Sequence, residues 1–243
     1  MEVVLETQGL RKSFGGVLVI DDLSIHVERG EALGIVGPNG AGKTTWFNLV
    51  TGAVGLDGGK VMFEGTDITH MSKHGRCRAG IGRTFQIPKP FVGMTVFENV
   101  LVAATQGRKR KYSEKASYGK CIESVEFAGL EDKVNVLAGA LTLLDRKRLE
   151  LARALASEPS LLLLDEIAGG LTEAEVKELI GEIKKLRATG MTIVWIEHVV
   201  HALLAVVDRI SVINFGQNLC EGNPRDVMNS PEVQACYMGG TPA

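Results

Sequence analysis

Residues 37–45, GPNGAGKTT, complete the pattern G-x-x-x-x-G-K-[S/T] and constrain the fold of this chain more than any other stretch. An apolar run at 32–36 precedes the pattern, and residues 46–50 can continue it as a helix. In such a context the glycines let backbone N–H groups converge on a polyphosphate, and the helix N-terminus adds partial positive charge. The pattern therefore predicts a nucleotide-binding α/β fold, in which Lys43 reaches the β- and γ-phosphates and the Thr44 hydroxyl ligates Mg²⁺.

The composition is that of an ordinary globular protein. The 243 residues are 45% hydrophobic and 23% charged, and the formal net charge of −2 gives no general electrostatic reason to bind nucleic acid. No apolar run approaches the ~18 residues that a membrane helix needs, and the N-terminus has no signal-peptide pattern. The four cysteines lie far apart, which favours reduced cytoplasmic thiols over a disulfide framework.

Apolar periodicity divides the chain into a strand-rich part and a helical part. We expect strands at residues 17–20, 23–27, 60–65, 161–164 and 192–196. Between about 94 and 157 apolar residues recur at helical spacing, and residues 173–188 form an amphipathic helical pattern. Short apolar runs that alternate with helices are typical of buried parallel strands, so the pattern predicts an α/β core with a helical insertion.

Polar residues after the apolar runs form a second part of the candidate site. Asp165 follows four leucines at the carboxyl end of a predicted strand, which is the edge where ligands bind in α/β sheets. A carboxylate there can hold Mg²⁺ opposite Thr44, and the adjacent Glu166 can deprotonate the water that attacks a γ-phosphate. His198 ends the next apolar strand at the same edge, where an imidazole can contact the γ-phosphate. Gln86 stands at the entry to the helical part, where its carbonyl can ligate Mg²⁺ and move with that part.

These residues also have plainer interpretations. An Asp-Glu pair after a strand can be charge at a helix N-terminus, and a strand-end histidine is usually structural or exposed. The phosphate-binding pattern upstream favours the chemical interpretation.

Two further patterns are interpreted as surface features. Residues 107–111 are a short basic run, for which we expect a solvated loop, with contact to an anionic membrane surface as the alternative. His70, His74 and Cys77 have the spacing of metal ligands on a helix, but three cationic neighbours oppose a divalent ion. We therefore expect a polar surface helix there.

Together the motifs resemble the nucleotide-binding subunits of ABC transporters over residues 5–240. Residues 37–45 resemble the Walker A motif and residues 161–165 the Walker B motif. The resemblance implies an α/β fold: a RecA-like P-loop NTPase core, an antiparallel β subdomain and an inserted α-helical signature subdomain. It implies a single ABC ATPase domain over residues 1–243, with the core at about 1–88 and 158–243 and the helical subdomain at about 89–157.

The resemblance also implies a role for each motif residue. Glu166 takes the position of the catalytic glutamate, His198 that of the switch histidine, and Gln86 that of the Q-loop. Phe14 stands where the family stacks an aromatic ring on adenine. The ATP-binding set is Phe14, Gly37, Pro38, Asn39, Gly40, Ala41, Gly42, Lys43, Thr44, Thr45, Gln86 and Asp165, with Thr142 directed to the ATP of a facing subunit. The catalytic set is Glu166, His198 and Lys43, and the Mg²⁺ ligands are Thr44, Gln86 and Asp165.

Two stretches, at about 80–100 and 222–239, resemble the ATPases of branched-chain amino acid importers. Urea and amide importers share this pattern, and lipopolysaccharide-export ATPases share part of it. The implied function is hydrolysis of ATP, with Mg²⁺ as cofactor, to drive uptake of amino acids, urea or similar small polar solutes. The implied partners are permease subunits, a second ATPase subunit and, indirectly, an external solute-binding protein. Nucleic acid is not among them, and the implied location is the cytoplasmic face of the cell membrane, peripherally bound. The alternatives are a lipopolysaccharide-type export ATPase and a regulatory ABC ATPase outside transport.

The chain departs from the family pattern in the signature and the two loops after Walker B. Leu144 replaces a signature glycine that lets the backbone approach the facing γ-phosphate, and Asp145 adds a carboxylate where phosphate charge is expected. Ile167 replaces the proline after the catalytic glutamate, and Thr172 replaces an Asp or Asn of the D-loop. These departures imply two unequal ATP sites and favour a heterodimer with a different ATPase over a homodimer.

Overall fold

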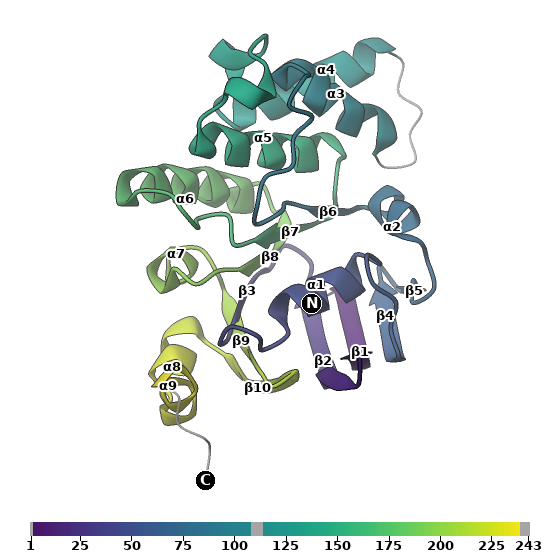
Figure 1. The fold of residues 1–243 in the computed structure, drawn as a ribbon, viewed down its shortest axis with the longest axis vertical. Coiled ribbons are helices and arrows are strands. Elements are labelled where there is room, and N and C mark those ends of the chain that lie inside the picture. The colour runs from purple at the N-terminus through teal and green to yellow at the C-terminus, as the bar shows by residue number, and fades with distance from the viewer. Residues whose placement is uncertain (1, 108–113, 239–243) are drawn as a thin grey trace.

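Two β-sheets and a group of helices make up the computed structural model, which describes residues 2–107 and 114–238 (Figure 1). The first sheet is antiparallel and has the order β2-β1-β4-β5. Its strands are β1 (Val3–Phe14), β2 (Val17–Glu28), β4 (Gly58–Phe63) and β5 (Thr66–Asp67). The runs at 17–20 and 23–27, which we expected as two strands, form the single strand β2. Asp22 between them has a left-handed φ of 55°. The strand continues through this residue because register shifts in its pairing with β1 accommodate the irregularity.

The second sheet is mainly parallel and has the order β10-β9-β3-β8-β7-β6. Its parallel strands are β3 (Ala32–Val36), β6 (Ile81–Arg83), β7 (Leu161–Asp165), β8 (Thr192–Ile196) and β9 (Arg209–Asn214), and β10 (Gln217–Gly222) pairs antiparallel with β9. Every residue of β3, β7 and β8 is buried, as expected for strands that are covered on both faces. Because these three strands are parallel neighbours, their carboxyl ends meet at one edge of the sheet.

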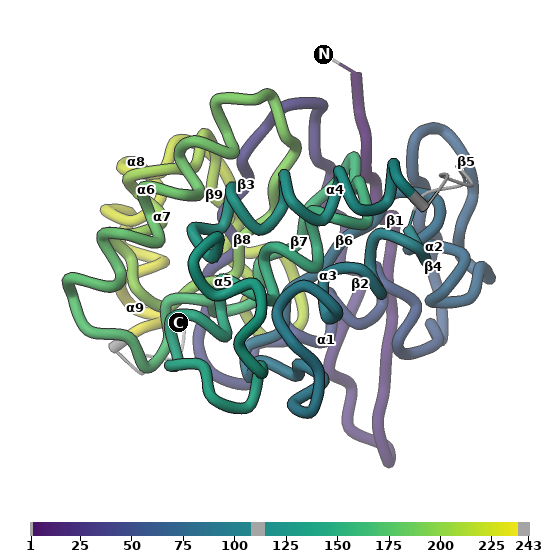
Figure 2. Tube along the Cα trace, turned by 90° about the horizontal axis from the view of Figure 1, so that it is seen from above, coloured from purple at the N-terminus to yellow at the C-terminus, as the bar shows by residue number. Residues whose placement is uncertain are grey.

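Alternate residues of the parallel strands enter two separate apolar clusters. In β7, Leu161 and Leu163 pack in a cluster with the antiparallel sheet and helix α1 (Lys43–Val50). Leu162 and Leu164 pack on the other face, against α6 (Glu173–Ala188) and α7 (Val200–Leu204). Figures 1 and 2 both show α6 and α7 on the side of the molecule opposite β4 and β5. The period-two side-chain pattern of each strand thus builds both layers of the core.

The helical part has its own apolar cluster, built from α3 (Val96–Gln106), α4 (Glu114–Phe127) and α5 (Leu143–Ala156). Short 3₁₀ turns at Glu131–Lys133 and Ala138–Ala140 connect α4 to α5. Thr95 and Glu98 form a reciprocal capping box that starts α3. Figure 1 shows this group at one end of the molecule, beyond α6 and the parallel sheet.

The remaining helices are short. Helix α2 (Lys73–Ala79) leads into β6, and α8 (Pro224–Asn229) and α9 (Pro231–Met238) follow β10. In the parts of the chain that the structure describes, no helix is both long and apolar enough to cross a membrane. The basic residues 108–111 lie outside the described residues, so the expectation for that run stays untested.

The buried strand β7 generates a stability prediction. Leu163→Ala removes apolar contacts between the sheet and α1 and is expected to lower the free energy of unfolding by about 2–5 kcal/mol. Leu204→Ala on α7, whose side chain is 40% exposed, is the matched control and should cost less than about 1 kcal/mol. Denaturant titration of both variants measures the difference, and equal losses would contradict this description of the core.

Candidate functional site

The phosphate-binding pattern forms the turn between β3 and α1. Gly37 is buried and has a φ of 149°, and a Cβ on it would lie 2.0 Å from the carbonyl oxygen of Ile213 in β9. No side chain fits at that distance, so the close packing of β3 and β9 requires glycine at this position. The backbone turns there and leads directly into the first turn of α1.

Lys43, the first residue of α1, is folded back into this turn. Its ammonium group donates hydrogen bonds to the carbonyl oxygens of Gly37 at 2.7 Å and Pro38 at 2.9 Å. Burial lowers the pKa of Lys43, and the carboxylates of Glu166 and Asp165 act in the opposite direction. The arrangement holds a cation inside the loop, next to backbone that is shaped to receive an anion.

A residue that sequence reasoning did not select as a site residue also holds the loop. The N–H of Gly37 donates a 2.9 Å hydrogen bond to the hydroxyl oxygen of Tyr237 in α9. The peptide groups around Gly37 are therefore held from two sides, by Tyr237 at the amide and by Lys43 at the carbonyl. Tyr237 belongs to a stretch noted only for its family resemblance, and the contact spans 200 positions of sequence. The spacing of residues in the sequence gives no signal for the contact between Gly37 and Tyr237.

Asp165 ends β7 beside this loop and is 2% exposed. Its Oδ2 atom forms a 2.6 Å ion pair with Nη2 of Arg83 at the end of β6. Its Oδ1 atom is buried and has no hydrogen-bond partner. Burial raises the pKa of Asp165, and the Arg83 guanidinium opposes this rise. An unpartnered buried carboxylate oxygen at the sheet edge fits a hard divalent cation such as Mg²⁺.

Glu166 brings three of the predicted residues together. One carboxylate oxygen accepts a hydrogen bond from the amide nitrogen of Gln86, and the other lies 2.7 Å from Nε2 of His198. Glu166 has a left-handed φ of 46°, and its N–H donates to the carbonyl of Ile196 at 2.8 Å. Such a backbone is strained for a non-glycine residue and is characteristic of functional sites. The adjacent Ile167, which stands in place of proline, is buried in the core.

Glu197 is a second residue that sequence reasoning missed. Its buried carboxylate accepts backbone hydrogen bonds from Ala168 at 3.0 Å and His198 at 3.0 Å. Burial raises its pKa, and the backbone hydrogen bonds oppose the rise. Glu197 thus ties the loop after β7 to the loop after β8 and fixes the backbone on which His198 stands.

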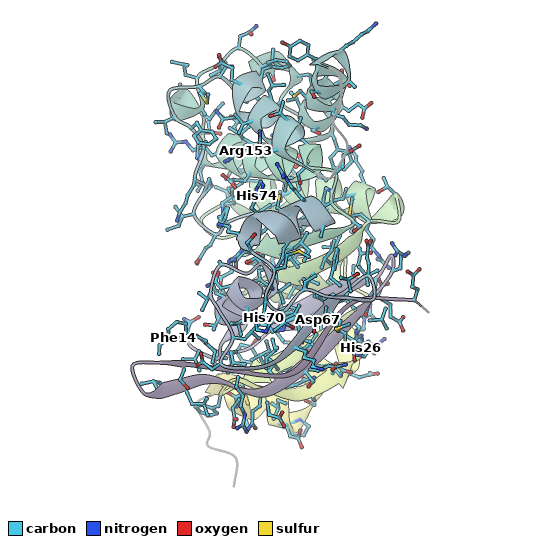
Figure 3. The ribbon with its side chains drawn as sticks, turned by 90° about the vertical axis from the view of Figure 1, so that its right-hand side faces the viewer. Phe14, His26, Asp67, His70, His74 and Arg153 are labelled. Atoms are coloured by element: carbon cyan, nitrogen blue, oxygen red, sulfur yellow. The ribbon has the colours of Figure 1, made fainter. Side chains whose placement is uncertain are left out.

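Phe14 lies at the end of β1, close to the turn of the β1–β2 hairpin (Figure 3). Its ring is 45% exposed, and the Lys12 ammonium lies 5.4 Å from the ring centroid. This exposure is compatible with stacking of the ring on a planar base. The stacking role stays a prediction.

The start of α5 corrects one expectation about the signature. Asp145 does not present its charge outward: it is 4% exposed, and both of its oxygens lie 2.9 Å from the ammonium of Lys133. Burial acts to raise the pKa of Asp145, but the hydrogen bonds from Lys133 and Thr142 hold it below its usual value. The carboxylate charge expected to oppose phosphate is thus neutralised inside the chain, because Lys133 at the end of the 3₁₀ turn Glu131–Lys133 supplies the opposite charge.

Thr142 is exposed, but its hydroxyl is already used at the N-terminus of α5. The Thr142 hydroxyl accepts a hydrogen bond from the N–H of Asp145 at 3.2 Å and donates its proton to Asp145 Oδ2 at 2.8 Å. Leu144 is buried. The hydroxyl expected to meet a facing nucleotide is therefore already satisfied within its own helix N-terminus. Thr172, at the D-loop, likewise caps α6 in a reciprocal box with Glu175.

The structure does not place His70 and His74 near α2 as a pair of metal ligands. Helix α2 begins at Lys73, so His70 precedes it and shares no helical face with His74, and Figure 3 shows the two histidines apart. The expected single helix through 70–77 is wrong, because Ser72 caps the helix at that point. In the described ranges, no group of three His, Cys, Asp or Glu residues is arranged to hold a metal ion. Arg76, expected on the surface, is buried and donates to the carbonyls of Leu49 and Val50.

Comparison with known proteins gives consistent similarities. A sequence model of a family described as "ABC transporter" matches residues 20–169. A probable branched-chain amino acid transport ATP-binding protein of Archaeoglobus fulgidus is 36% identical, over 97% of this chain and 95% of that protein. A high-affinity branched-chain amino acid transport ATP-binding protein of Pseudomonas aeruginosa is 34% identical, over 97% of this chain and 98% of that protein.

Solved structures agree with these similarities. The ADP conformation of an ATP-binding cassette of an ABC transporter is 32% identical, with a TM-score of 0.89, over 98% of this chain and all of that one. A nucleotide-free ATP-binding cassette is 31% identical, with a TM-score of 0.88, over 97% of this chain and 98% of that one. The arrangement of core, antiparallel sheet and helical part is therefore the fold of these cassettes.

The Tyr237 contact generates a prediction. Tyr237→Phe keeps the ring but leaves the buried N–H of Gly37 without its acceptor, which is expected to cost about 1–3 kcal/mol. Denaturant unfolding should show this loss, and equilibrium titration with ATP should show weaker binding than in the unmodified chain. If both quantities are unchanged, the hydroxyl is not an anchor of the loop.

Proposed function

Because this chain belongs to the ABC transporter family and is an ATPase whose hydrolysis of ATP is coupled to transport, we propose that it serves an importer of small polar solutes. Branched-chain amino acids are the first candidate solutes, with urea and amides next. The support is that relatives similar over nearly their whole length are named for branched-chain amino acid transport. The observation that carries the ATPase role is the carboxylate of Glu166, held between Gln86 and His198 beside the phosphate loop.

The phosphate loop, Lys43 and Phe14 would bind ATP. The Lys43 ammonium would leave the carbonyls of Gly37 and Pro38 for the β- and γ-phosphates, and Phe14 would stack on adenine. The oxygens of Thr44, Gln86 and Asp165 would hold Mg²⁺, which supplies positive charge to the phosphate oxygens when bound. The buried Oδ1 atom of Asp165 is free for this role.

Glu166 would act as the base in hydrolysis. The water oxygen forms a bond to the γ-phosphorus, the bond from that phosphorus to the bridging oxygen breaks, and the water proton moves to Glu166. Both oxygens of Glu166 are engaged by Gln86 and His198 in this structure, so one contact must open before the carboxylate accepts a proton. Gln86 lies between β6 and the helical part, so movement of that part would release it. His198 would then contact the γ-phosphate, and the catalysis would depend mainly on positioning and charge.

The proposed partners are permease subunits and a second ATPase subunit, with a solute-binding protein acting indirectly. Two ATPase subunits would face each other with ATP between the phosphate loop of one and the signature of the other. The chain would lie at the cytoplasmic face of the cell membrane, held there by the permease.

The signature supports a pair of unlike subunits. Leu144 is buried at a position where the family has glycine, and the Thr142 hydroxyl donates its hydrogen bond to the carboxylate of Asp145. The N-terminus of α5 therefore offers a facing nucleotide fewer free donors than an open signature would. The site that combines this chain's phosphate loop with a partner's signature would be the active one.

A first prediction tests the base. In the assembled transporter, Glu166→Gln should lower ATP turnover by at least about 100-fold while ATP remains bound, because the amide cannot accept the proton. Glu126→Gln on the exposed face of α4 is the matched control and should keep the unmodified rate. Turnover, measured by phosphate release, at the unmodified rate in Glu166→Gln would reject Glu166 as the base.

A second prediction tests the asymmetry. The chain purified alone should hydrolyse ATP slowly and without cooperativity, since a homodimer would contain two copies of the closed signature. Reconstitution with the ATPase that co-purifies from membranes should restore turnover. Robust, cooperative hydrolysis by a homodimer of this chain would contradict the proposal of unlike subunits.

A further inference from the structure

Arg83 holds one defined oxygen of Asp165. The parallel register of β6 and β7 pairs Arg83 with Leu163, which brings the guanidinium beside the carboxylate two residues further along β7. Nη2 of Arg83 lies 2.6 Å from Oδ2 of Asp165, and Oδ1 receives no hydrogen bond. The two oxygens of the Asp165 carboxylate therefore differ: Oδ2 is bound by Arg83, and Oδ1 has no hydrogen-bond partner.

The guanidinium is itself fixed from three other sides. Nη1 donates to the side-chain oxygen of Asn48 in α1 at 2.7 Å. The rings of Phe47 and Phe85 lie 5.4 and 5.3 Å from the central guanidinium carbon. A planar group stacked on two rings and hydrogen-bonded at both amino nitrogens has little freedom to rotate. Asp165 thus has a rigid partner rather than a mobile one.

We propose that Arg83 is a positioning residue for the magnesium site: it fixes the side-chain orientation of Asp165 so that Oδ1, and not Oδ2, faces the cation or its water. The proposal rests on the proposed function, in which Asp165 serves Mg²⁺. A partner in the outer shell that orients a ligating carboxylate is a recurrent feature of metal sites. The plainer reading is that Arg83 only neutralises a buried charge, and the experiment separates the two.

The test uses Arg83→Lys and a matched arginine. R83K keeps a cation beside the buried carboxylate, so the chain is expected to fold. The lysine has one nitrogen in place of the two that reach Asn48 and Asp165, and it cannot stack as a plane, so it does not fix the orientation of the carboxylate in the same way. Arg153 (Figure 3) and Arg83 both line a cavity between α2, β6, α3 and α5. Arg153 pairs with Glu150 at 2.9 Å, and its guanidinium carbon lies 5.1 Å from the centroid of the Phe91 ring. R153K therefore repeats the chemical change without touching Asp165.

The measurement is equilibrium binding of a fluorescent ATP analogue to the full chain, first in EDTA and then across a titration with Mg²⁺. In R83K the Mg²⁺ concentration at half-maximal effect should rise by about tenfold, whereas affinity in EDTA should stay within about twofold of the unmodified chain. R153K should leave both quantities unchanged. If R83K lowers affinity equally with and without Mg²⁺, or leaves the midpoint where R153K leaves it, the positioning role is overturned.

A further variant, Asp165→Asn, tests whether Asp165 serves Mg²⁺ separately from whether Arg83 orients it. D165N should itself raise the Mg²⁺ midpoint, and R83K added to D165N should produce no further rise, because there is no longer a carboxylate to orient. A raised midpoint in D165N with an unchanged one in R83K overturns the role of Arg83 alone. An unchanged midpoint in D165N overturns the proposed role of Asp165, and the inference with it. An additive rise in the double variant shows that Arg83 acts independently of Asp165 and also overturns the proposal.

Discussion

Parallel pairing of β3, β8 and β7 brings the loops that follow these strands to one edge of the sheet. The pairing runs from Ala32 with Ile193 to Asp165 with Ile196, and all three strands are buried along their whole length. Side chains on both faces hold this register, because a slip of one residue would exchange the two apolar clusters. The phosphate loop, Asp165, Glu166 and His198 are neighbours for that reason, although they come from three separate segments of the chain.

The same edge gathers buried charges, and each is compensated by hydrogen-bonding or oppositely charged groups close to it. Lys43 is held by backbone carbonyls, Asp165 by Arg83, and Glu197 by the N–H groups of Ala168 and His198. A buried charge without such a partner would be strongly unfavourable. The compensation makes a polar site compatible with a well-packed core, and it also fixes the orientation of each functional group.

Much of the fold could be predicted from sequence where the pattern is local. Residues 173–188 are helix α6 and residues 192–196 are strand β8, because apolar periodicity and capping residues act over one or two turns of chain. The Walker motifs likewise predicted which residues gather at the edge. Contacts between distant segments carry no such signal. Arg83 meets Asp165 across 82 positions and Lys133 meets Asp145 across 12, so neither the partner of Asp165 nor the cation that neutralises Asp145 was predicted.

The contact between Gly37 and Tyr237 has a consequence for the order of events during synthesis. Its two residues are separated by 200 positions, so the ribosome completes the phosphate loop long before it makes the hydroxyl that anchors it. At typical elongation rates of about 5–20 residues per second, the delay is roughly 10–40 s. For that interval the nascent chain carries the full nucleotide-binding motif with its first peptide group unsecured. The motif that is most easily recognised in the sequence is thus made 200 residues before the hydroxyl that holds it.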